Sequence, residues 1–193
     1  MIAGVQYALA YALSSAAGVR ALLALAIASL AIHAGWMHPP PSLLWLGSMP
    51  VTIALLALAA VEIFADKLPL LDHALHVAQI VLKPMVAAIL VVGSLHGLPG
   101  PELVGLVALG ALNALGIHAA TASARGASTL TTGGMANPIL SLGEDVGALL
   151  LALFGFLLPW LGALLALLVG ATAVWVLMRV RHTIAAKRTA SGD

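Results

Sequence analysis

The sequence predicts an all-α fold: a polytopic helical membrane protein with one domain, residues 1–182, and a polar cytoplasmic tail, residues 183–193. Of its residues, 62% are hydrophobic and 8% are charged, whereas soluble domains carry about 25% charged residues. The apolar runs show no alternation of period two, which favours membrane helices over a barrel. The lipid bilayer is therefore the expected surrounding, and the net charge of +1 gives no reason to expect a nucleic-acid partner.

About six membrane-spanning helices are expected, since a span needs about 20 apolar residues. The first lies within residues 4–34, either as one long tilted helix or as a short helix followed by a span that starts near Ser15. A loop of residues 35–49 follows, with three consecutive prolines and two tryptophans typical of a membrane interface. The second span, residues 48–65, begins with a capping serine and an early proline.

The middle of the chain is expected to hold an amphipathic helix, residues 70–83, because its polar residues recur at helical spacing. Pro84 then opens a short third span that ends near Leu95. The fourth span covers residues 102–122. The polar run 121–136 is expected to be non-helical, either an ordinary loop or backbone that lines a cavity.

The last two spans are expected at residues 137–158 and 161–178. The first of them starts with an asparagine and a proline and carries two adjacent carboxylates, Glu144 and Asp145. A charged side chain inside a bilayer costs at least about 2.5 kcal/mol. These two acids are therefore expected to be paired, hydrated or used in function.

Basic residues predict the orientation of the six spans. Seven of the eight fall on one side: Lys67, Lys83, Arg125, Arg179, Arg181, Lys187 and Arg188. The loops at 35–49, 96–101 and 158–160 contain none. By the positive-inside rule, both termini are expected to face the cytoplasm.

The two halves of the chain carry similar features in the same order, which leaves open a 3+3 inverted repeat of residues 1–98 and 99–182. Each half has an arginine among small residues, then a proline at a helix start, then an acidic helix. The spacings differ, because Arg20 and Glu62 are 42 residues apart and the corresponding residues of the second half are 19 apart.

Three motifs point to a family. The run EIFADKLPLLD at 62–72 resembles the E-x-x-A-D-K-x-P-x-x-D signature of a bacterial membrane-protein family, domain of unknown function 4126. Residues 18–21 resemble its Gly-x-Arg-Ala element, and residues 141–145 resemble its Ser-x-x-Glu-Asp element. The run TTGGMANP departs from the Ser-Pro-Glu-Pro type of sequence found there in such proteins. The resemblance implies a membrane location, expected to be a bacterial inner membrane, and brings no activity with it.

Polar groups at membrane depth are the candidates for binding an ion or a solute. They are Arg20, Glu62, His118, Arg125, Ser141, Glu144 and Asp145. Buried charges need partners, so the arginines are expected to pair with the acids, and Ser141 lies one helical turn before both acids of its helix. The alternative is a structural ion-pair network that locks the helices together.

A second candidate site is the D-H-x-x-H run of Asp72, His73 and His76, whose two histidines could share a metal ion. The polar face of a surface helix is the favoured alternative for these residues. The absence of cysteine excludes disulfides and thiolate metal sites.

The leading interpretation is a small transporter or channel for an ion or a small polar solute. In it, intramembrane carboxylates bind a cation or a proton, and arginines balance the charge. An intramembrane metal-dependent enzyme or a lipid-headgroup-binding protein is one alternative, although no complete catalytic set is visible. A structural assembly partner is another, and a homo-oligomer stays open.

Overall fold

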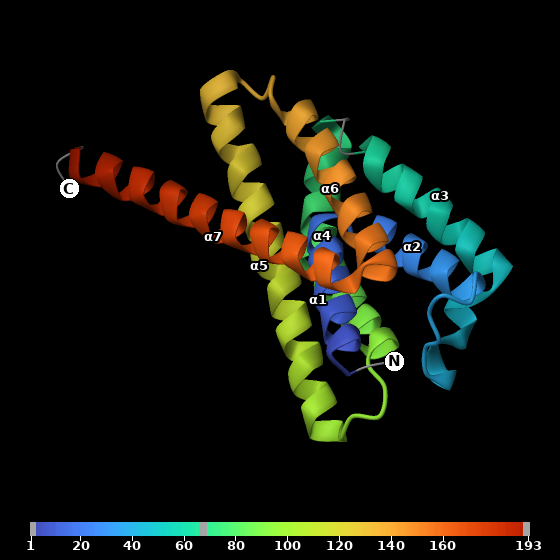
Figure 1. Cartoon of the computed structure of the whole chain (residues 1–193). Helices are drawn as coiled ribbons and strands as arrows, with labels where there is room; N and C mark the ends of the chain where they lie inside the picture. The colour runs from blue at the N-terminus through green and yellow to red at the C-terminus, as the bar shows by residue number, and fades with distance from the viewer. Residues whose placement is uncertain (1–2, 66–68, 191–193) are drawn as a thin grey trace.

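The computed structural model describes residues 3–65 and 69–190, apart from the side chains of residues 3, 69–76, 181 and 183–190. The described residues form helices and connecting turns, with no strand among them (Figure 1). The elements are α1 (Ala3–Val19), α2 (Ala21–His33), the 3-10 helix η1 (Pro41–Gly47), α3 (Met49–Ala65), α4 (Pro69–Ser94), α5 (Gly100–Thr132), α6 (Asn137–Leu157) and α7 (Pro159–Ala190).

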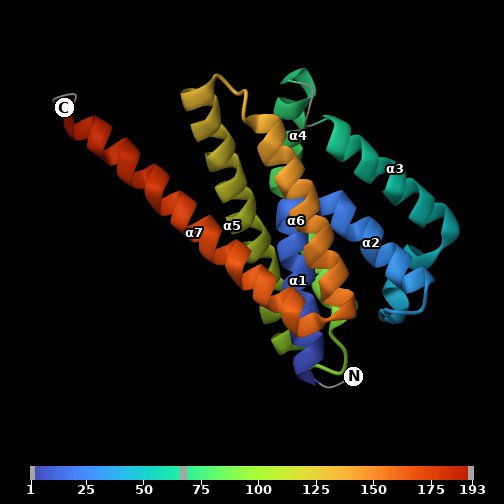
Figure 2. The ribbon, with the colours of Figure 1, turned by 45° about the horizontal axis from the view of Figure 1, so that its top comes forward.

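Helix α1 lies in the middle of the bundle and packs against α4, α5, α6 and α7 (Figure 2). Ala12, Leu13 and Ala16 are completely buried there. Small residues let neighbouring backbones approach. At Gly18, an added Cβ would lie 2.8 Å from Cα of Ala114 in α5, so only glycine fits.

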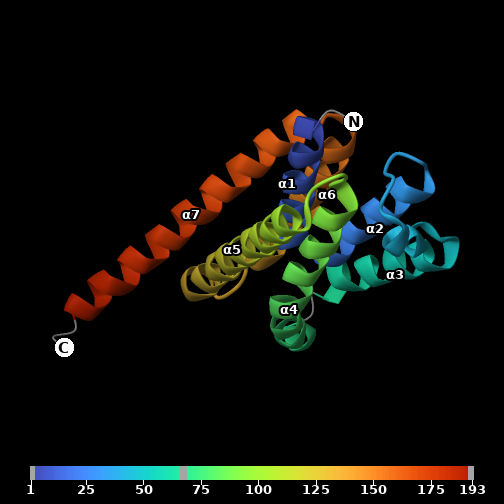
Figure 3. The same ribbon diagram turned by 90° about the horizontal axis from the view of Figure 1, so that it is seen from below.

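A break at Arg20 separates α1 from α2. Its backbone is extended, with φ −137° and ψ 102°, and α2 turns back to pack along α3 (Figures 1 and 2). Seen from below, α2 and α3 form a pair on one side of α1, and α7 extends on the other side (Figure 3). One long helix through residues 4–34, the first of the two alternatives, is therefore absent. The second alternative, a short helix followed by another, placed the break near Ser15, whereas the structure has it at Arg20.

The two ends of the described chain lie at opposite ends of the bundle (Figure 2). Near the start of α1, the Tyr7 hydroxyl donates to Oε1 of Glu102 at the start of α5, 3.0 Å away. An added Cβ at Gly4 would lie 3.1 Å from Trp160, at the start of α7. Helix α7 then continues for 32 residues away from this end.

The placement of both termini on one side of the membrane, which follows from six complete spans, stays a prediction. Since α1 and α5 start at the same end and run in the same direction (Figure 2), the structure gives no support to an inverted repeat, whose first helices would run in opposite directions.

The structure confirms a helical membrane protein. Among the described residues, four stretches are long and apolar enough to cross a bilayer: Val77–Ser94, Gly100–Thr132, Asn137–Leu157 and Pro159–Val180. A fifth arises if η1 and α3, which are bent by 67° to one another, are taken as one span. The six-span count stays a prediction.

Helix α4 combines the expected amphipathic helix and the expected third span. Pro84 lies inside it, which a membrane bundle tolerates because neighbouring groups compensate for the lost backbone hydrogen bond. Gln79 and Lys83, one turn apart, are both buried. Lys83 is 2% exposed and therefore lies inside the bundle. The side of the membrane on which it was expected stays a prediction.

The polar run after the fourth span is helical, contrary to the prediction. Its hydroxyl groups are satisfied inside the helix, since each donates to a carbonyl one turn earlier. The donor–acceptor distances are 2.7 to 2.9 Å for Ser123, Thr129, Thr131 and Thr132. Helix α5 therefore continues until Gly133, whose φ of 63° provides the left-handed end. Helix α7 also includes residues 183–190 of the expected polar tail, and the cytoplasmic location of this tail stays a prediction.

Candidate functional site: a buried charge cluster beside a cavity

Seven ionisable side chains gather around the break between α1 and α2, where α3, α4, α5 and α6 approach it. We call them the charge cluster, and its members are Arg20, Glu62, Lys83, His118, Arg125, Glu144 and Asp145. Six of the seven were predicted as site residues from the sequence. The seventh, Lys83, was not.

Arg20 connects the helix break to α6. The guanidinium is 1% exposed, and its Nε lies 2.8 Å from Oδ1 of Asp145. Its Nη2 donates to Oγ of Ser141 at 2.9 Å and lies 3.6 Å from Oε2 of Glu144. Three residues of a single helical turn of α6 therefore surround Arg20, as the spacing of Ser141, Glu144 and Asp145 predicted.

Glu62 of α3 caps the start of α2. Arg20, at the N-cap position, provides no side-chain acceptor, so the first N–H groups of α2 need another partner. The carboxylate accepts from the backbone N–H of residues 21, 22 and 23 at 3.2, 3.0 and 3.3 Å. Its negative charge also suits the positive end of a helix dipole. Glu62 therefore holds α2 in place against α3.

Arg125 of α5 and Glu144 of α6 form a two-pronged ion pair. Nε of Arg125 donates to Oε1 of Glu144 at 3.1 Å, and Nη2 donates to Oε2 at 2.5 Å. Such bidentate pairs are among the stronger and more directional polar contacts. Helices α5 and α6 pack only loosely on one another elsewhere. The pair is therefore a main connection between them.

Lys83 of α4 and His118 of α5 form a second pair inside the bundle. Nζ of Lys83 lies 3.0 Å from Nδ1 of His118, and the two residues are 2% and 5% exposed. Because an ammonium group only donates, Nδ1 is the acceptor when Lys83 is charged. The helical spacing of Gln79 and Lys83 with the buried Val86 and Leu90 was the sequence signal for this inward face.

The cluster is balanced in charge. In formal charge at pH 7, with histidine counted as neutral, its three carboxylates match two arginines and one lysine. Glu144 and Glu62 attract the Lys83 ammonium, whereas Arg20 and Arg125 repel it. The six charges thus act as one interacting group.

A cavity of about 480 Å³ lies between α5, α6 and α7, next to the cluster. Glu144 is the only ionisable residue among the described residues that line it. Its other polar lining residues are Thr121 and Thr172, and the rest of the wall is apolar. Gly143 and Gly147 also line it, and a Cβ at either would meet nothing within 4 Å. Glu144 therefore belongs both to the charge cluster and to the cavity wall.

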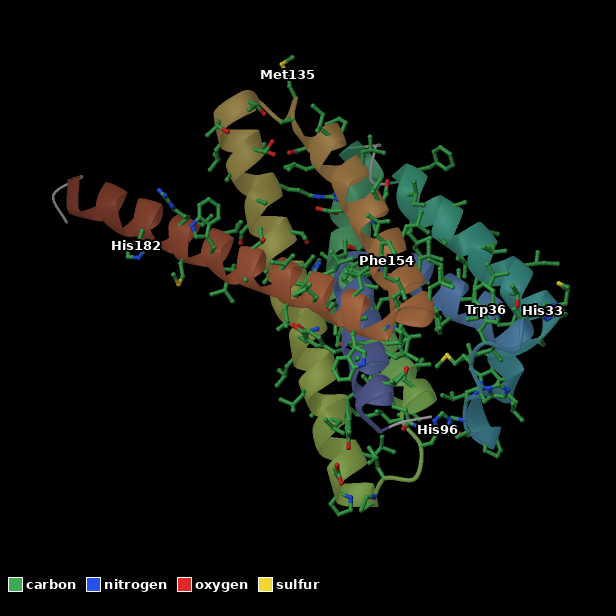
Figure 4. All side chains as sticks on the ribbon, viewed as in Figure 1. His33, Trp36, His96, Met135, Phe154 and His182 are labelled. Atoms are coloured by element: carbon green, nitrogen blue, oxygen red, sulfur yellow. The ribbon has the colours of Figure 1, made fainter. Side chains whose placement is uncertain are left out.

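The predicted metal site lies beyond what the structure describes, since the side chains of Asp72, His73 and His76 are not included. Among the residues that are described, no three His, Asp or Glu side chains are placed to hold a metal ion. His33 and His96 lie far from the Met135 end of the bundle, and His182 lies on the projecting part of α7 (Figure 4).

A family model with the description "Domain of unknown function (DUF4126)" matches residues 7–179. The chain belongs to the DUF4126 family. This confirms the resemblance found in the sequence motifs, and the matched DUF4126 region contains the whole charge cluster and every residue of the cavity wall. The search of the curated proteins and the search of the solved structures found no match.

Proposed function

We propose that this DUF4126 protein is a small membrane transporter for an ion or a small polar solute, and that Glu144 is the group the solute meets. The observation that carries the proposal is the double position of Glu144, in the buried charge cluster and in the cavity wall. Intramembrane ionisable residues that line a cavity are typical of solute and ion pathways.

The alternative of a purely structural network explains part of the cluster only. The carboxylate oxygens of Glu62 accept the three hydrogen bonds that cap α2, and the residue is 1% exposed. The acids of α6 keep some exposure, 13% for Glu144 and 12% for Asp145, as does Arg125 with 18%. A pair built only to lock helices gains nothing from this exposure, whereas a binding group needs it.

The Arg125–Glu144 pair is a suitable gate. It connects two helices that otherwise pack loosely, and a solute that competes for Glu144 would release Arg125 and let α5 and α6 separate. Because ligands shift a two-state equilibrium only through differential affinity, this exchange of partners supplies the required difference between closed and open states.

We also propose an orientation in a bacterial inner membrane with the end of α7 in the cytoplasm. Arg125 lies in the second half of α5 and Arg179 in the second half of α7, and both helices run toward this end (Figure 2). Basic residues favour the cytoplasmic side. The start of α1 would then face the opposite side, in place of the two cytoplasmic termini expected from an even number of spans.

The test is ion and solute flux in proteoliposomes that contain the purified protein, with protons, Na⁺, K⁺ and chloride followed separately. Flux above that of empty vesicles should be lost in Glu144→Gln and retained in Glu102→Gln, whose carboxylate lies at the far end of α5. Equal flux in wild type and Glu144→Gln, or none above empty vesicles, would refute the proposal.

A further inference from the structure

The cavity between α5, α6 and α7 suits an organic molecule better than a bare metal ion. Its volume of about 480 Å³ lies within the range of about 300–1,000 Å³ typical of small-molecule sites. Hard metal cations such as Ca²⁺ take about six to eight oxygen ligands. The side chains of this cavity offer one carboxylate, Glu144, and two hydroxyls, Thr121 and Thr172.

The chemistry of the wall also selects the charge of the occupant. Glu144 is the only ionisable side chain on it among the described residues, and the surrounding wall includes Leu150, Leu168 and Val176. A molecule with an apolar body and one positive charge complements both features. Its body would replace water or lipid on the leucine and valine side chains, and its charge would replace the Arg125 guanidinium at the carboxylate.

Such a cation would unbalance the charge cluster, which is neutral when Lys83 is protonated. An extra positive charge in a weakly polar interior is costly. Loss of one proton from Lys83 removes the excess, because Lys83 is a buried member of the same cluster and its Nζ lies 3.0 Å from Nδ1 of His118, which remains a hydrogen-bond partner of the neutral amine. The cation and the Lys83 proton therefore compete for the negative charge of the same cluster.

We propose that this cavity binds a hydrophobic organic monocation in exchange for one proton held by Lys83 and His118. The proposal rests on the proposed transport function and names its substrate class. The proton passes to water, and the neutral Lys83 amine stays hydrogen-bonded to the imidazole, so that charge is conserved. By reciprocity, proton loss strengthens cation binding as much as cation binding favours proton loss.

Other charged groups also affect the protonation of Lys83. Those that act on Lys83 from the elements around it are Arg20 at the helix break, Glu62 on α3, Arg125 on α5 and Glu144 on α6. On α4 itself, the side chains of residues 72–76 lie outside the part of the chain that the structure describes. Arginine keeps its charge at any ordinary pH, which leaves Lys83 and His118 as the basic groups able to release a proton.

The test is calorimetric titration of the purified full-length protein in detergent with tetraphenylphosphonium, between pH 6 and pH 9. Two buffers of different ionisation enthalpy give the number of protons released. We expect about one proton per bound cation and an affinity that rises with pH, by up to about tenfold per unit where the exchange is complete. No tetraphenylphosphonium binding, or binding with no proton release, would overturn the inference.

A matched pair of glycine variants tests the location without touching a charge. Gly147→Phe should fill the cavity and abolish binding, because Gly147 lines it with open space around its Cβ position. Gly116→Phe is the control, since Gly116 also has nothing within 4 Å of this position and does not line the cavity. Equal binding by both variants contradicts the assignment, as does a lipid that copurifies stoichiometrically with wild type and is absent from Gly147→Phe.

Variants of Lys83 and Glu144 test the exchange itself. Lys83→Met should still bind tetraphenylphosphonium, but without proton release and without pH dependence, provided that size-exclusion chromatography shows a folded protein. Glu144→Gln should lose binding. If Glu144-dependent flux of another ion occurs without tetraphenylphosphonium binding, transport stands and this substrate class is wrong. Binding with proton release but without any flux supports the site and refutes transport.

Discussion

Removal of the Glu62 carboxylate should open the start of α2. Glu62 accepts hydrogen bonds from three successive backbone N–H groups, of Ala21, Leu22 and Leu23, at 3.0 to 3.3 Å. In Glu62→Ala these buried donors lose their acceptor. Hydrogen bonds in membrane proteins contribute about 0.6 kcal/mol each on average, and typical protein hydrogen bonds about 1 kcal/mol. The three together give about 2–3 kcal/mol of local stability.

Hydrogen–deuterium exchange followed by mass spectrometry measures this effect directly. A loss of about 2–3 kcal/mol corresponds to amide exchange about 30- to 150-fold faster, since 1.4 kcal/mol is tenfold. The acceleration should be confined to residues 21–24. Glu62→Gln keeps an acceptor oxygen and should show a smaller effect. Glu102→Ala is the control, because its carboxylate accepts from Tyr7 at the other end of the bundle. Unchanged exchange at 21–24 in Glu62→Ala would refute the assignment of Glu62 as the cap of α2.

Two further predictions follow from close contacts. Gly18→Leu should lower the melting temperature strongly or prevent folding, because its Cβ would lie 2.8 Å from Cα of Ala114. Gly116→Leu, with open space around it, should melt like wild type, and equal melting of the two variants would contradict the packing described. Arg125→Gln should increase the distance between spin labels near the ends of α5 and α6, because the pair with Glu144 connects these helices. The labels can be attached to introduced cysteines, since the chain has no cysteine of its own. Unchanged distances between the labels would contradict the role of the Arg125–Glu144 pair as a connection between α5 and α6.

Local sequence patterns predicted the helical elements well where each helix has its own start and stop. The proline after Asn137 and the glycines 133 and 134 before it coincide with the turn between α5 and α6. The prediction was wrong where a run of polar residues was taken to indicate a loop. The hydroxyl-rich end of α5 is helical, since its hydroxyl groups bond to the helix's own carbonyls, and no hydropathy average contains that information.

The candidate site was predictable in its members more than in their roles. The free-energy cost of placing a charge inside the membrane was enough to select Arg20, Arg125 and the acids. In the structure, both arginines form ion pairs with the acids of α6. Glu62 was expected to bind a cation or a proton, which stays a prediction, and the structure shows that it caps a helix 40 residues earlier in the chain. Lys83 was predicted only as one of the basic residues on one side of the membrane, and the structure shows that it is buried beside His118.

The sequence by itself determined the membrane environment, the all-helical fold, the family and the set of charged residues that have to find partners. The family follows from its motifs, and the other three follow from composition and from the free energy of moving each residue into lipid, which depend on local sequence only. The tertiary structure alone decided the backbone break at Arg20, the return of α2, and the choice of Glu144 as the acid that lines the cavity. Those depend on contacts between residues far apart in the chain, such as Arg20 with Ser141, which lies 121 positions later, and no local pattern encodes which distant partner each charge meets.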